Sequence, residues 1–120
     1  MAAYTSAMST YTPMEIAIIR RLADELVEAG IPVRHLRVFG SRARGHSDEQ
    51  SDLDIVVELE VPPDKALTRR IRELGRGLSI QPEAGAPGLR VQIVPLFEGE
   101  DATPLARTIA HEAETVWTRT

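Results

Sequence analysis

Cysteine is absent from this chain of 120 residues, and aromatic residues are scarce. Without thiols the chain can form no disulfide, no thiolate zinc site and no cysteine nucleophile, which agrees with a reducing, cytoplasmic location. Because only 4% of the residues are aromatic, the core must consist mainly of leucine, isoleucine, valine and alanine. The same scarcity counts against an aromatic platform on which nucleic-acid bases could stack.

Basic residues are fewer than acidic ones: the chain has 14 lysine and arginine residues and 18 aspartate and glutamate residues, for a formal net charge of -4. This balance is the opposite of the basic surface that binds nucleic-acid backbones, so we expect no nucleic-acid partner. No apolar stretch has the length of a membrane span. Residues 1–12 lack the basic start and the apolar run of a secretory signal.

The chain length suits one domain, which we place at residues 13–120 after a flexible N-terminal tail of residues 1–12. The start of the first helix is the clearest boundary, because Thr12, Pro13 and Glu15 form a capping-box sequence. Hydrophobic periodicity and the Gly and Pro positions predict the elements in this order: a helix over 13–29, strands over 36–39 and 52–60, a helix over 64–78, a strand over 89–97 and a final helix over 103–116.

The helix over 64–78 has a basic outer face. Such a face is usually solvated, although it can also meet an acidic partner. Its cations are Lys65, Arg69, Arg70, Arg72 and Arg76. The histidines show no ligand spacing and are expected to be surface or structural residues: His35, His46 and His111.

The chemistry resides in two short motifs, of which the first reads Gly-Ser-Arg-Ala-Arg-Gly at residues 40–45. A strand that runs into Gly40-Ser41 and then into a helical turn directs backbone N–H groups at one spot, and glycine lets a phosphate approach closely. Ser41 can add a hydroxyl donor. Arg42 and Arg44 follow, and a guanidinium fork matches phosphate oxygens, although a surface role fits each arginine equally well.

The second motif, Ser-Asp-Leu-Asp at residues 51–54, follows after five further residues. Asp52 and Asp54 are two apart on a predicted strand, so both carboxylates leave the same face while Leu53 and Ile55 point into the core. Neighbouring carboxylates repel one another unless a cation lies between them. Magnesium prefers a few carboxylates together with substrate phosphates, and one or two such ions would account for the pair.

Together, Gly-Ser-x-Ala-Arg-Gly, five residues and Ser-Asp-x-Asp resemble the signature of the minimal nucleotidyltransferases, the MNT family of the DNA polymerase β superfamily. Every fixed position is matched, with Ile55 in place of a frequent leucine. The ending over residues 109–117 is similar to the usual terminal helix of that family. The resemblance implies an α+β nucleotidyltransferase fold, in which helices pack on a mixed β-sheet.

The resemblance further implies transfer of a nucleoside monophosphate, with AMP expected, from ATP or another nucleoside triphosphate. Gly40 and Ser41 would bind the phosphates, and Asp52 and Asp54 would be the catalytic ligands of Mg2+. Related domains are often antitoxins of HEPN-type toxins, which they modify or cover. Because so small a domain has little surface for an acceptor pocket, we expect a protein partner of this kind or a homo-oligomer.

Members of the family use a third carboxylate, which completes the metal site and helps to deprotonate the attacking hydroxyl. In the matching strand, alternation places Gln92 at that position. An amide oxygen can coordinate a metal weakly, but it cannot act as a base near neutral pH. A shifted register would instead leave Gln92 as an exposed strand residue. Of the nearby acids, Glu58 is about 13 Å along the strand from Asp54, and Glu98 can substitute only if its strand bends.

Three hypotheses about function follow. The first is an Mg2+-dependent enzyme that transfers a nucleoside monophosphate to a hydroxyl of a partner protein. The second is a catalytically degenerate subunit that binds nucleotide or a partner, marked by Gln92. The third, a transferase that acts on small molecules such as aminoglycosides, is weaker because those enzymes carry additional domains.

Overall fold

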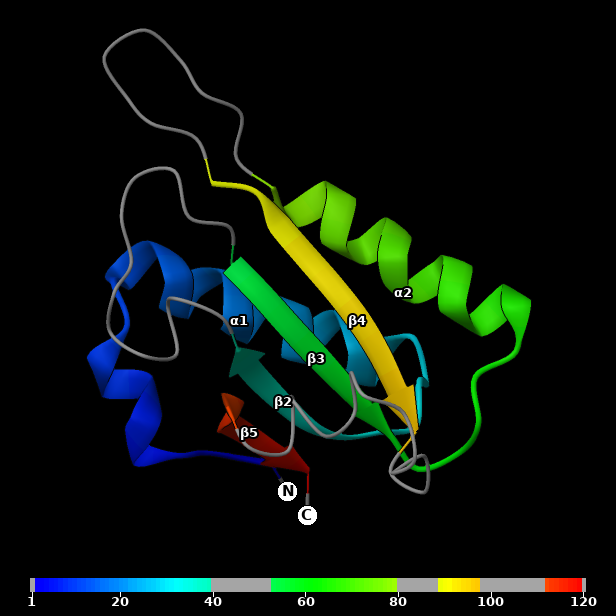
Figure 1. The fold of residues 1–120 in the computed structure, drawn as a ribbon, viewed down its shortest axis with the longest axis horizontal. Helices are drawn as coiled ribbons and strands as arrows, with labels where there is room; N and C mark the ends of the chain where they lie inside the picture. Colours follow the sequence, from blue (N-terminus) through cyan, green and yellow to red (C-terminus); the bar gives the residue numbers. More distant parts are fainter. Residues whose placement is uncertain (1, 40–52, 80–88, 98–111, 120) are drawn as a thin grey trace, which may run out of the picture.

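The computed structural model describes residues 2–39, 53–79, 89–97 and 112–119, and these ranges are the basis of every structural statement that follows. Their elements are, in order, β1 (Ala2–Tyr4), η1 (Ser6–Thr10), α1 (Pro13–Glu28), β2 (Val33–Phe39), β3 (Leu53–Leu59), α2 (Lys65–Leu78), β4 (Val91–Phe97) and β5 (Glu114–Arg119). The strands form one sheet in the order β1-β5-β2-β3-β4 (Figure 1). None of the described helices is long and apolar enough to cross a membrane.

The sheet is mixed, which confirms the predicted α+β fold class. β2 is antiparallel to both β3 and β5, and β1 is antiparallel to β5. β3 and β4 are parallel, and α2 provides the crossover that a parallel pair requires. Pro95 lies in β4, at an edge of the described sheet, where a residue without an N–H group is tolerated.

Local sequence signals determine both ends of α1. Thr12 Oγ1 accepts a hydrogen bond from the Glu15 N–H at 3.2 Å, and the Thr12 N–H donates to Glu15 Oε1 at 2.8 Å, so the predicted capping box is present. At the other end, Gly30 adopts a φ of 72°. The Gly30 N–H donates to the Val27 carbonyl and the Ile31 N–H to the Leu26 carbonyl, which is the Schellman pattern that terminates a helix.

The core lies between the sheet and the two helices, which pack on the same face. Leu53 and Ile55 of β3 are fully buried there, as the alternation of the strand predicted. Against them pack Leu22 of α1 and Ile71 of α2, which are also fully buried. Gly75 brings α2 close to β4, because a Cβ atom at this position would lie 2.8 Å from the side chain of Ile93.

The N-terminal segment differs from the flexible tail that we expected at residues 1–12. It contains β1, which pairs with β5, and the short helix η1. Met8 and Tyr11 are only 6% and 7% exposed and belong to the core cluster. Burial of these two side chains stabilises the docking of a segment whose polar composition had suggested a tail.

The C-terminal prediction was wrong from residue 114 onwards. Residues 114–119 form strand β5, between β1 and β2, rather than the end of a helix. Of the rest of the predicted helix, Glu112 is helical and residues 103–111 lie outside the described ranges. Leu105, Ile109 and Val116 have helical spacing, but the final run Glu-Thr-Val-Trp-Thr-Arg is rich in β-branched and aromatic residues and fits a half-buried strand.

Tyr11→Phe is expected to stabilise the protein by about 1 kcal/mol at pH 7. The buried Tyr11 hydroxyl has no hydrogen-bond partner within the described ranges, and such a group carries an uncompensated desolvation cost.

Burial, reinforced by the Glu114 and Glu15 carboxylates, strongly raises the pKa of Tyr11. Above about pH 10 the unfolded chain therefore loses the phenolic proton while the folded chain keeps it, and stability falls as the pH rises. The Phe variant should lose less stability in that range.

Urea unfolding at pH 7 and at about pH 10.5, followed by the fluorescence of Trp117, measures both effects. Tyr4→Phe is the matched control, because Tyr4 is 36% exposed and its pKa is also raised by burial. A larger loss of stability at pH 7 from Tyr11→Phe than from Tyr4→Phe would mean that the Tyr11 hydroxyl has a favourable partner.

Candidate functional site

Asp54 lies near the end of the sheet at which β3 and β4 both begin. In the strand register it pairs with Phe39 of β2 on one side and with Gln92 of β4 on the other. Adjacent strands are about 4.8 Å apart, so Asp54 and Gln92 leave the same face of the sheet as direct neighbours. Both side chains are partly accessible, on the face opposite the one that α1 and α2 cover.

The other residues predicted for the site lie outside the described ranges: Gly40, Ser41, Arg42, Arg44 and Asp52. The strand ends next to them are described. Phe39, which precedes Gly40 in the sequence, pairs with Asp54. Leu53, which follows Asp52, pairs with Val91, and its N–H donates to the Arg90 carbonyl at 2.9 Å. The two motifs are therefore joined to neighbouring strands at one end of the sheet.

The register of β4 agrees with the alternation read from the sequence. Val91 and Ile93 are 7% and 9% exposed and face the helices, so Gln92 faces the other way, beside Asp54. The shifted register that would have separated these two residues does not occur. The position at which the family resemblance implies a carboxylate is thus adjacent to Asp54 and contains an amide.

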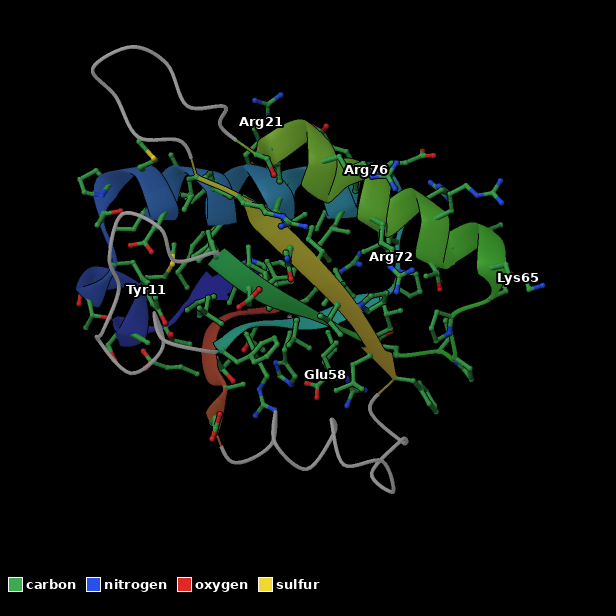
Figure 2. The ribbon with its side chains drawn as sticks, turned by 45° about the horizontal axis from the view of Figure 1, so that its top comes forward. Tyr11, Arg21, Glu58, Lys65, Arg72 and Arg76 are labelled. Carbon is green, nitrogen blue, oxygen red and sulfur yellow. The ribbon has the colours of Figure 1, made fainter. Side chains whose placement is uncertain are left out.

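Glu58, labelled in Figure 2, is four residues after Asp54 in β3 and so occupies the same face of the strand, but a separate polar cluster contacts it. Its two carboxylate oxygens lie 3.8 Å from Arg37 Nη1 and 3.9 Å from His35 Nε2, and its side chain is only 11% exposed. Arg37 Nε also donates to Thr115 Oγ1 at 3.0 Å, and His35 Nδ1 lies 3.1 Å from Thr118 Oγ1. The cluster links β2, β3 and β5, which makes His35 a structural histidine, as expected.

Arg37 is a polar residue of this face that the sequence analysis did not select. It pairs with Val56, two residues from Asp54 along β3, which corresponds to about 6.6 Å. Arg37 lies within the predicted strand over residues 36–39, which β2 extends back to Val33. Its guanidinium contacts Glu58 and Thr115, so Arg37 belongs to the polar cluster on the face that also contains Asp54.

The donor atoms at this end suit magnesium by their chemistry. Asp54 offers carboxylate oxygens and Gln92 an amide oxygen, and Asp52 is two residues before Asp54 in the sequence. Hard cations prefer oxygen donors. Within the described part of the chain, no group of three His, Cys, Asp or Glu residues is placed to hold a metal. A metal here would depend on Asp52, Asp54 and the substrate phosphates.

The fold is that of a nucleotidyltransferase. It matches the crystal structure of a candidate nucleotidyltransferase from Sulfolobus solfataricus with a TM-score of 0.58 and 22% identity, over 98% of this chain and 91% of that one. It also matches a toxin-antitoxin structure solved with AMP-PNP, with a TM-score of 0.58 and 20% identity, over 87% of this chain and 73% of that one. At these identities the likeness concerns the fold alone.

The family follows from the sequence. A family model described as "Nucleotidyltransferase domain" matches residues 19–114, and the chain belongs to this family. A curated relative from Methanocaldococcus jannaschii, named as a candidate protein adenylyltransferase, is 45% identical over 47 residues. That match spans 39% of this chain and 54% of the relative, so the chain aligns with only about half of that protein.

Proposed function

We propose that this chain transfers AMP from ATP, or the corresponding nucleoside monophosphate from another triphosphate, to a hydroxyl group of a partner protein. The observation that carries the proposal is the strand register. Asp54 lies beside Gln92 and Phe39, at the strand ends that continue into Gly40-Ser41 and Asp52. Membership of the nucleotidyltransferase family supports the reaction class, and the name of the Methanocaldococcus jannaschii relative supports a protein acceptor.

In this reaction the acceptor oxygen forms a bond to the α-phosphorus, the bond between that phosphorus and the bridging oxygen of the β-phosphate breaks, and pyrophosphate leaves. Gly40 and Ser41 would bind the β- and γ-phosphates and orient the leaving group in line with the attacking oxygen. Asp52 and Asp54 would hold Mg2+, which, when bound, offsets the negative charge on the phosphate oxygens. Arg42 and Arg44 would add guanidinium contacts to the same phosphates.

The attacking hydroxyl must also lose a proton, and the Gln92 amide cannot accept it near neutral pH. We infer that the proton passes to solvent or to a group of the acceptor protein. The same residue favours a second candidate function. If no group replaces the missing carboxylate, the chain is a subunit that binds nucleotide and a partner without turnover.

For the acceptor we propose the toxin of a toxin-antitoxin pair, of the HEPN type that the family resemblance implies. The support is the shared fold with the toxin-antitoxin structure that contains AMP-PNP. In either candidate function the antitoxin would bind its toxin, and the two differ in whether AMP is transferred.

Gln92→Asp is expected to raise the transfer rate by a factor on the order of 100, because it restores a carboxylate beside Asp54 that can accept the hydroxyl proton. Gln92→Asn is the matched control, since it has the same length as Asp but remains an amide. The measurement is the incorporation of label from α-labelled ATP into the purified partner in the presence of Mg2+, together with ATP binding by calorimetry.

Transfer by the wild-type chain would support the enzyme. If the wild type transfers no label but Gln92→Asp does, the result would support the subunit without turnover. If neither protein binds ATP with Mg2+, both candidate functions fail.

A further inference from the structure

Helix α2 has a line of cations along its solvent side. Four exposed residues occupy positions 65, 69, 72 and 76, at successive spacings of four, three and four residues. At 3.6 residues per turn these positions fall within a sector of about 60° and extend over about 16 Å of helix. Opposite them, Ile71 and Leu78 face the core. We call Lys65, Arg69, Arg72 and Arg76 the basic stripe.

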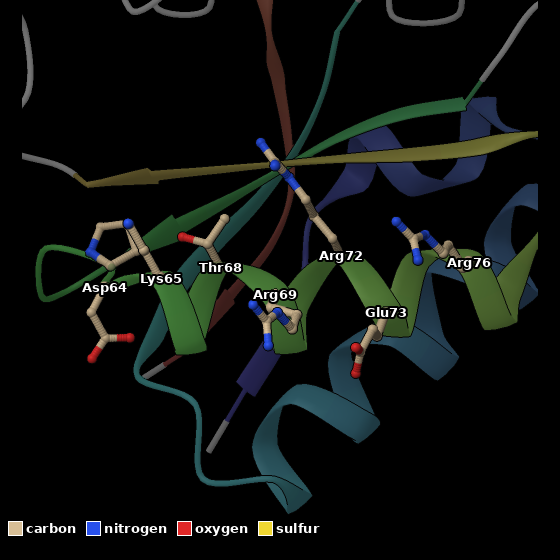
Figure 3. A pocket seen from close by; sticks show the side chains of 8 residues that line it. Asp64, Lys65, Thr68, Arg69, Arg72, Glu73 and Arg76 are labelled. Carbon is tan, nitrogen blue, oxygen red and sulfur yellow. The ribbon is translucent and has the colours of Figure 1, made fainter.

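The basic stripe borders a surface groove of about 420 Å³, together with Pro63, Asp64, Thr68 and Glu73. Figure 3 shows the side chain of Arg72 leaving α2 towards β4 and that of Arg69 in front of the helix. Of the acids, Asp64 is engaged as the N-cap of α2, because its Oδ1 accepts the Leu67 N–H at 2.7 Å. Glu73 is the second acid, and the four cations of the basic stripe outnumber the two acids in the groove.

These cations have no compensating partners in the described part of the chain. No hydrogen bond or ion pair there involves the four side chains, whereas the neighbouring Arg70 donates to the Ala29 carbonyl at 3.1 Å. Lys65–Leu78 contains five basic residues and one acidic residue, a net charge of +4. Since the chain totals -4, all other residues together carry -8. The positive field is concentrated on one face of an acidic protein.

We propose that the basic stripe is a docking surface for an acidic α-helix of a partner protein. A helix with carboxylates at the same spacing of four, three and four residues would place one carboxylate against each cation. The spacing is identical when read in reverse, so the partner helix can lie parallel or antiparallel to α2. A nucleic acid fits less well, because the groove has no aromatic residue for stacking and the rest of the chain repels phosphates.

The stripe leads towards the end of the sheet that contains Asp54. α2 runs back along the sheet to Ser79, whose Oγ accepts the Val91 N–H at 3.0 Å, and Val91 pairs with Leu53. A helix docked on the stripe therefore has one end near the strand ends of the candidate site. The docking surface is independent of the proposed transfer reaction, because it involves neither Asp54 nor Gln92.

The test uses a labelled alanine-based helical peptide with four glutamates at the matched spacing, and fluorescence anisotropy in the absence of nucleotide and Mg2+. A peptide of the same composition with glutamates spread around the helix is the comparison. We expect the matched peptide to bind more tightly, and Arg69→Glu with Arg76→Glu to weaken its binding at least about tenfold, less so at high salt. Arg20→Glu with Arg21→Glu, on α1, gives the same net charge and should have little effect.

Circular dichroism establishes that each variant is folded, and Arg69→Gln with Arg76→Gln, which only neutralises the charges, should show an intermediate loss. Four results would overturn the proposal. The first two are equal affinity for the two peptides and equal loss of affinity in the two charge-reversal variants. The others are tighter binding of a single-stranded oligonucleotide of the same charge and a self-association in sedimentation that depends on the basic stripe. None of these results depends on transfer activity, so a failure here is distinguishable from a failure of the proposed reaction.

Discussion

Replacement of Asp54 by asparagine is expected to lower the rate of nucleotide transfer by a factor on the order of 100 to 1000. Asp54 lies at the strand end where β2, β3 and β4 come together, with Phe39 and Gln92 as its register partners. Asparagine has nearly the same shape and should preserve this packing, but it has no negative charge with which to hold a metal beside the phosphates. Mg2+-dependent binding of ATP should weaken as well, and it can be measured even if turnover is slow.

The control is Asp24→Asn, which removes an exposed carboxylate from α1. This variant should transfer AMP and bind ATP as the wild type does, and both variants should unfold near the wild-type temperature. An Asp54→Asn protein that remains folded and retains full Mg2+-dependent ATP binding would remove Asp54 from the metal site and contradict the proposed role of the motif.

Trp117→Ala should cost about 3 to 5 kcal/mol of unfolding free energy, a large part of the total stability of a small domain. Trp117 is 2% exposed and lies in β5, where it pairs with Leu36 of β2 and Tyr4 of β1. Its truncation would open a cavity between sheet and helices that the surrounding strands cannot close. Urea unfolding followed by far-ultraviolet circular dichroism measures the loss without a tryptophan signal.

Two controls separate burial from general loss of apolar surface. Trp117→Phe keeps most of the ring volume and should cost less than Trp117→Ala. Val27→Ala removes an apolar side chain that is 40% exposed on α1 and should change the stability by no more than about 0.5 kcal/mol. A cost below about 1 kcal/mol for Trp117→Ala would show that β5 does not contribute its tryptophan to the core.

Local signals predicted much of the fold. The capping box at Thr12 and Glu15 and the left-handed Gly30 act over a few residues, and both ends of α1 were read correctly. The start of α2 was also correct, because Asp64 caps it through its own side chain. The alternation of Leu53 and Ile55 with Asp54 predicted which face of β3 is buried. Each of these features depends on near neighbours in the chain.

The predictions for the two terminal segments were wrong because pairing between strands distant in the sequence decides their structure. Residues 2–4 form β1 only because β5 lies beside them, and the register joins Ala3 to Thr118, at the opposite end of the chain. Likewise, the helical spacing that includes Val116 is overridden by the position of β5 between β1 and β2, where its backbone is hydrogen-bonded on both sides. Short apolar runs fit either a helix or a strand, and tertiary context selects between them.

By itself, the sequence determined which functional residue types are present: a Gly-Ser pair and an Asp-x-Asp pair at a spacing typical of nucleotidyltransferases, together with a basic face on the helix over residues 64–78. Only the tertiary structure decided that Gln92 is the neighbour of Asp54, that Glu58 is held by Arg37 and His35, and that the basic stripe has no partner among the described residues. The physical reason is that residue types and caps act locally, whereas strand register and surface exposure depend on segments brought together by burial of a common core.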